Sequence, residues 1–130
     1  MKLNTLFLIY ALTALGFCFG LILFPAFWIT LYGARADAQA SLLLSLVGAL
    51  FGGLAVMAWV GRNAPPSRSR DAAVLGLAVS NGLAAMVAVF GAVSGVYNQF
   101  AWGPVITFVL FTVGFIVIGR PGATATTASS

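Results

Sequence analysis

The chain has 130 residues, of which 62% are hydrophobic and only 6% are charged, with a formal net charge of +4. Soluble globular domains carry about 25% charged residues, so this composition excludes an ordinary water-soluble domain. It also argues against a nucleic-acid-binding domain, because the basic residues flank apolar runs and do not form a basic domain of their own.

Four apolar runs are long enough to cross a bilayer, since a hydrocarbon core of about 30 Å needs about 20 helical residues. Each of these runs lacks a charged residue: 6–24, 42–60, 72–93 and 100–118. They predict an all-α fold, an integral membrane four-helix bundle over residues 1–120, with a disordered cytoplasmic tail over 121–130. The uncharged stretch 3–34 is much longer than the apolar core of a signal peptide, so we expect the first helix to be retained.

The first span ends near Pro25, because proline lacks a backbone donor and restricts the residue before it. The segment that follows carries Trp28 and Tyr32, which favour the headgroup level of a membrane. It predicts an interfacial turn or short helix, and the alternative is one long proline-kinked helix that reaches Tyr32. Ser41 is the expected N-cap of the second span.

The loop 63–70 contains two prolines and cannot continue the second helix. Asp71 fits the first turn of the third helix, where a negative charge is favoured. The third span gives way to an uncharged loop at 94–99, and Pro104 suits the first turn of the fourth helix.

The basic residues predict how the helices are oriented. With four spans, five basic residues share one side of the membrane and Arg35 stands alone on the other. Lysine and arginine accumulate in short cytoplasmic loops, so we expect two in-out-in hairpins with both termini in the cytoplasm, in a multi-pass protein of the cell inner membrane. The five residues are Lys2, Arg62, Arg68, Arg70 and Arg120.

The chain lacks the residues that most active sites need. It has no histidine and no glutamate, and its two aspartates, Asp37 and Asp71, are expected at opposite membrane faces. Protein-ligated zinc, carboxylate-bridged diiron and serine–histidine–aspartate sites are therefore excluded. Cys18 alone cannot perform dithiol exchange, and coupled transport usually needs an ionisable group within a span. We expect no enzyme activity and no cofactor.

The most exceptional polar residue within the spans is Asn81, which follows Ser80 near mid-membrane. The favoured interpretation is an interhelical hydrogen bond, worth about 0.6 kcal/mol on average in membranes. The alternative is a contact to a ligand or ion. Tyr10 and Thr13, which share a face of the first helix at a spacing of three, are candidate partners.

Small residues recur at spacings of four and let helix backbones approach closely. Because short connections make antiparallel neighbours, we expect the second and third helices to pack against each other through these residues. The pairs on the first and third helices are then expected at surfaces for self-association or for a larger partner. The packing glycines are Gly16, Gly20, Gly48, Gly52, Gly76, Gly91 and Gly95.

The chain shows an overall pattern of size, spacing and hydropathy. Its landmarks, in order, are Pro25, Leu31-Tyr32-Gly33, the loop 61–71, Asn81 and the segment from Gly91-x-x-x-Gly95 through Trp102. It resembles the small four-helix bacterial inner-membrane proteins of uncharacterised function, and the resemblance implies a bacterial cell membrane. We expect a non-catalytic structural or accessory subunit, or a self-associating bundle. The alternative is a passive pore or a binder for a small or lipid-like molecule. The expected partners are the lipid bilayer and either a second copy or a larger membrane complex, with no nucleic acid.

Overall fold

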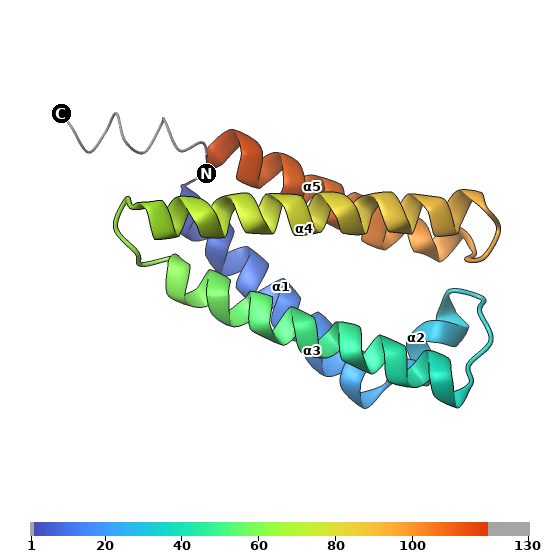
Figure 1. The fold of residues 1–130 in the computed structure, drawn as a ribbon. Coiled ribbons are helices and arrows are strands. Elements are labelled where there is room, and N and C mark those ends of the chain that lie inside the picture. The colour runs from blue at the N-terminus through green and yellow to red at the C-terminus, as the bar shows by residue number, and fades with distance from the viewer. Residues whose placement is uncertain (1, 120–130) are drawn as a thin grey trace.

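The computed structural model describes residues 2–119 (Figure 1), which form five α-helices and one short 3-10 turn. The fold class predicted from the sequence, all-α, is confirmed for these residues. The tail expected over 121–130 lies outside them. The elements are α1 (Leu3–Leu23), α2 (Pro25–Leu31), α3 (Ala38–Gly61), α4 (Arg68–Val93), η1 (Gln99–Ala101) and α5 (Trp102–Ile118).

Four of the helical segments are long and apolar enough to cross a membrane: α1, α3, α4, and η1 together with α5. The 24 residues of α3 span about 36 Å at 1.5 Å per residue, against about 30 Å of hydrocarbon core. Large apolar side chains such as Leu42, Met86 and Phe90 are mostly exposed, which is the arrangement that a bilayer covers. The chain therefore has the architecture of a multi-pass membrane protein.

Local sequence signals set most helix ends. Pro25 separates α1 from a short helix, α2, so the short-helix interpretation of this segment holds and the long kinked helix does not. Asp71 lies in the first turn of α4, as predicted. The expected N-cap of α3 is wrong: the Asp37 carboxylate accepts a hydrogen bond of 2.7 Å from the Ala40 N–H. The helix thus starts before Ser41, because Asp37 is an equally good capping residue.

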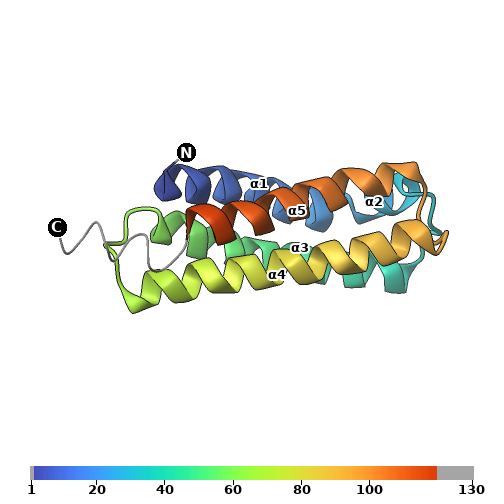
Figure 2. The same cartoon turned by 90° about the horizontal axis from the view of Figure 1, so that it is seen from above.

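The long helices associate in two pairs (Figures 1 and 2): α1 packs along α3, and α4 packs along α5. By contrast, α3 and α4 touch little although they are consecutive. This corrects the expectation that the second and third spans would be the close neighbours. The loop between them only keeps their ends together at one end of the bundle.

Glycines determine the α1–α3 contact. A Cβ atom at Gly48 would lie 3.0 Å from the Leu21 Cβ and 3.1 Å from the Cys18 carbonyl oxygen, and one at Gly52 would lie 3.0 Å from the Cys18 Sγ. Both glycines therefore face α1 and not α4. Gly76, expected at the same interface, has nothing within 4 Å of its Cβ position.

The other two predicted glycine pairs, Gly16 with Gly20 and Gly91 with Gly95, do not form continuous surfaces of small residues: one glycine of each pair is covered by an aromatic ring of the same chain, and the other has open space at its Cβ position. The Trp28 ring lies 3.1 Å from the Cβ position of Gly20, while nothing lies within 4 Å of Gly16. The Tyr97 ring covers Gly91. Gly95 lies beyond the end of α4 with φ +79°, so it does not continue a helical face with Gly91 as expected.

Asn98 joins the two helix pairs at one end of the bundle. Its Nδ2 donates to the Leu31 carbonyl (2.9 Å), and its backbone N–H donates to the Tyr32 carbonyl (2.8 Å). Gly33, at φ +79°, packs against the same side chain. This end, which also contains Arg35, is called the Asn98 end.

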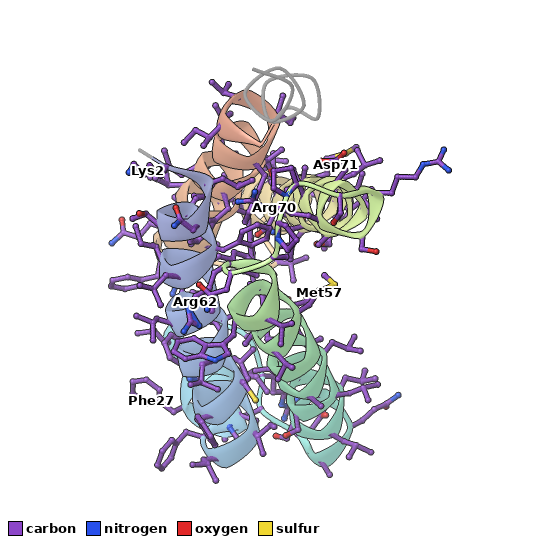
Figure 3. The ribbon with its side chains drawn as sticks, turned by 90° about the vertical axis from the view of Figure 1, so that its left-hand side faces the viewer. Lys2, Phe27, Met57, Arg62, Arg70 and Asp71 are labelled. Atoms are coloured by element: carbon purple, nitrogen blue, oxygen red, sulfur yellow. The ribbon has the colours of Figure 1, made fainter. Side chains whose placement is uncertain are left out.

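Basic residues gather at the opposite end, called the basic end and defined by Lys2, Arg62, Arg68 and Arg70. Figure 3 looks at this end and shows three of them, together with Asp71. The Arg62 guanidinium lies 3.6 Å from the ring centroid of Trp59.

Candidate functional site

Asn81 lies near the middle of α4 on its buried stripe. Leu77, Asn81 and Ala85 follow one another at a spacing of four, which places them on one helix face. Asn81 is only 2% exposed, so its side chain lies inside the bundle and not against lipid. Its Nδ2 donates to the Leu77 carbonyl at 2.7 Å. A side-chain amide offers two donors and two lone pairs, so this bond leaves most of its capacity available.

Tyr10 faces Asn81 from α1. It lies on the buried stripe of α1 with Phe7 and Ala14, and its ring packs edge-on against Phe111 with centroids 4.9 Å apart. Its hydroxyl is buried without a hydrogen-bond partner of good geometry in the described residues, although the Asn81 side chain is within its reach. A buried polar group left unsatisfied costs about 1–3 kcal/mol.

The two side chains meet at a cavity of about 160 Å³ between the helix pairs. Residues of α3 and α4 form its two walls, with Tyr10 from α1 and Phe108 from α5 beneath them. Three polar side chains and six apolar ones line it. The lining residues are Tyr10, Ser80, Asn81, Val47, Leu50, Phe51, Leu54, Ala84 and Phe108.

The cavity reaches the surface between α3 and α4, because these helices do not close against each other. Val47 and Leu50 are exposed on the α3 wall. In a bilayer this opening faces the acyl chains, so we refer to the cavity as the lateral groove. Apolar cavities of about 150 Å³ accommodate a benzene-sized molecule, so the groove has room for part of a larger ligand.

A second, much smaller cavity of about 10 Å³ adjoins Tyr10 and Asn81 on the other side. Thr13 and Thr107 line it, and each threonine hydroxyl donates to a carbonyl of its own helix. Three phenylalanine rings, Phe17, Phe51 and Phe108, stack around it with centroids 5.3–6.4 Å apart. A volume of this size holds about one water molecule, so the aromatic cluster seals the deep side of the groove.

The structure thus brings together the four polar residues singled out from the sequence. Asn81, Ser80 and Tyr10 line the lateral groove, and Thr13 lines the small cavity with Tyr10 and Asn81. The Ser80 hydroxyl donates to the Leu77 carbonyl at 3.2 Å. Sequence reasoning missed Thr107 and the phenylalanine cluster, because they join the site only through the arrangement of the helices.

The lining residues limit what the groove can do. A phenol, an amide and a hydroxyl surrounded by hydrocarbon can donate and accept hydrogen bonds, but none of them is a general base or an activated nucleophile near neutral pH. Such a site could hold an uncharged polar atom attached to an apolar body. Its selectivity would come from shape and from one or two hydrogen bonds.

Comparison with protein-family models, curated proteins and solved structures finds no match to the chain.

Proposed function

We propose that the chain is a non-catalytic membrane protein that binds a small or lipid-like molecule in the lateral groove. The observation that carries this proposal is the buried Tyr10 hydroxyl, which lacks a well-formed partner beside Asn81 in an apolar groove open to the bilayer. A ligand hydroxyl or carbonyl could complete the hydrogen bonds of both side chains.

Energetics favour this binding role over a purely structural role for the polar pair. An interhelical hydrogen bond in a membrane contributes about 0.6 kcal/mol on average, whereas an unsatisfied buried group costs about 1–3 kcal/mol. A pair selected only for packing would be expected to hydrogen-bond well, whereas the Tyr10 hydroxyl lies within reach of Asn81 without forming a bond of good geometry. The geometry therefore supports the binder more than the structural or accessory subunit that the sequence favoured.

The polar contact can be tested with two neutral probes, the methyl esters of octadecanoic acid and of its mid-chain hydroxy derivative. We expect the hydroxy ester to bind the purified protein up to tenfold more tightly, since one hydrogen bond is worth about 0.5–1.5 kcal/mol. Tyr10→Phe should reduce that difference, leaving only the part that Asn81 supplies, without lowering thermal stability. Native mass spectrometry would measure the bound probe.

A second pair of variants tests the location. Ala84→Leu fills the lateral groove and should weaken the binding of both esters several-fold. The control, Val87→Leu, adds bulk to the lipid-facing side of α4, where Val87 is 69% exposed, and should leave the binding of both esters unchanged. Equal binding to all variants would rule out the groove. Loss of stability in Tyr10→Phe would instead favour the structural role and, with it, an accessory or self-associating protein.

For the membrane orientation we propose two in-out-in hairpins in a bacterial inner membrane, with both termini and the basic end in the cytoplasm. The proposal is supported by the collection of Lys2, Arg62 and Arg70 at one end, where α4 also begins with Arg68, and by the place of Arg35 beside Tyr32 and Tyr97 at the other end, because basic residues accumulate in cytoplasmic loops.

Reporter fusions test this orientation. A cytoplasm-dependent reporter fused after Ser130 should be active, and the same reporter fused at Asp37 should be inactive. An exported reporter should give the opposite pattern at both sites. Exchange of the two patterns would show that the orientation is reversed. Activity of the same reporter at both sites would place Asp37 and Ser130 on one side of the membrane and would contradict the three spans proposed between them.

A further inference from the structure

We propose that the ligand of the lateral groove is an anionic lipid-like amphiphile, whose carboxylate or phosphate head group binds Arg35 at the Asn98 end. This inference rests on the proposed function, and it adds the chemical class and the orientation of the ligand. It starts from a cavity of about 310 Å³ that lies beyond the lateral groove, called the head pocket. The head pocket is lined by Ile29, Tyr32, Ala34, Arg35, Ala40, Leu43, Leu44, Val47 and Tyr97.

The head pocket and the lateral groove meet at Val47, which lines both. The remaining α3 residues of the two cavities follow helical spacing along one face, from Ala40 to Leu54. Fourteen residues of helix rise about 21 Å, which exceeds the thickness of one leaflet, about 15 Å of hydrocarbon. A single chain that enters beside Arg35 would therefore run along α3 and end near Tyr10 and Asn81.

The polar groups of the head pocket suit an anion. Arg35 is exposed and lines the head pocket, and one oxygen of the nearby Asp37 carboxylate accepts from the Ala40 N–H at the start of α3. A guanidinium presents a planar set of donors that matches carboxylate and phosphate oxygens. Tyr32 and Tyr97 add their phenols, and burial raises the pKa of Tyr32, so this phenol stays protonated and can donate.

The dimensions argue against a partner helix as the occupant. A helix with its side chains is about 10–12 Å across, so a partner helix could place only single side chains in a groove of about 160 Å³. An extended chain needs only a narrow channel. The polar pair at the far end then suits a chain that carries a hydroxyl or carbonyl group away from its head.

The test compares the mid-chain hydroxyoctadecanoic acid, in its ionised form, with its methyl ester, on the intact protein in neutral nanodiscs. We expect the acid to bind about tenfold more tightly than the ester, because hydrogen bonds to charged groups are the stronger ones. Arg35→Gln should abolish this advantage and leave ester binding unchanged. The matched control, Arg62→Gln at the basic end, should leave both affinities unchanged.

The outcomes separate the two proposals. Equal binding of acid and ester to the native chain would overturn the anionic head group while leaving the groove intact. An acid advantage that survives Arg35→Gln, or that is lost in Arg62→Gln, would overturn its place at Arg35. If Ala84→Leu weakens neither probe, the lateral groove itself is not the binding site.

Discussion

Replacing Gly48 with leucine should destabilise the folded protein by about 3 kcal/mol, at the upper end of the cost of overpacking. The Cβ atom of the new side chain alone would lie 3.0 Å from the Leu21 Cβ and 3.1 Å from the Cys18 carbonyl oxygen. These are backbone and near-backbone atoms of α1, so a change of rotamer cannot relieve the contact, and α1 and α3 would have to separate.

The matched control is Gly53→Leu, five residues further along the same helix. Nothing lies within 4 Å of its Cβ position, so we expect a change within about 0.5 kcal/mol. Unfolding in mixed micelles, followed by circular dichroism, would measure both variants. Similar losses for the two substitutions would show that α3 does not pack on α1 through Gly48.

Truncating Phe115 to alanine should cost about 3 kcal/mol, the lower end for such a cavity. Phe115 is fully buried where the two helix pairs meet, and its ring contacts Phe7 and Tyr10 with centroids 5.6 Å apart. Lipid is as apolar as the core, so little transfer energy is lost. The loss of dispersion contacts around the cavity remains.

Phe90→Ala removes the same atoms from the lipid-facing side of α4, where Phe90 is 69% exposed. Because lipid replaces the contacts of this side chain, the free energy of unfolding of the variant should lie within about 0.5 kcal/mol of that of the native chain. The same micelle titration compares the two. A larger loss of stability from Phe90→Ala than from Phe115→Ala would show that the face of α4 described here as lipid-facing is instead its packed face.

The spans could be predicted from the sequence because bilayer thickness imposes a minimum apolar length that few other structures need. Pro25 and Asp71 acted as their chemistry predicts, since each constrains only its own turn of helix. Ser41 was not the cap because the rule for N-caps accepts Asp37 as readily, and the helix begins at Ala38, directly after it.

The helix pairing could not be predicted in the same way. A short loop keeps two helix ends together, but it does not require contact along their length. Small residues permit close approach without naming the partner, so Gly48 and Gly76 looked alike in sequence while only Gly48 lies at a contact.

The candidate site shows the same division. Asn81 and Tyr10 were identifiable because polar residues are costly in a membrane and are therefore informative wherever they occur. Thr107 and Phe51 become part of the site only through the arrangement of the two pairs, so no local signal marked them.

The lateral groove exists only if α3 pairs with α1 and leaves its other face open toward α4. A disulfide between the native Cys18 and the variant Gly52→Cys tests this pairing most directly. The Cβ position of Gly52 lies 4.0 Å from the Cys18 Cβ and 3.0 Å from its Sγ, within the range of about 3.5–4.5 Å between Cβ atoms in disulfides. Gly53→Cys, which points away from α1, is the control.

After mild oxidation in membranes, the account predicts that Gly52→Cys forms an intramolecular disulfide in most chains, seen as a faster-migrating monomer that reverts on reduction, while Gly53→Cys does not. Failure of Gly52→Cys to crosslink, or crosslinking only between separate chains, would contradict the α1–α3 pair and with it the lateral groove.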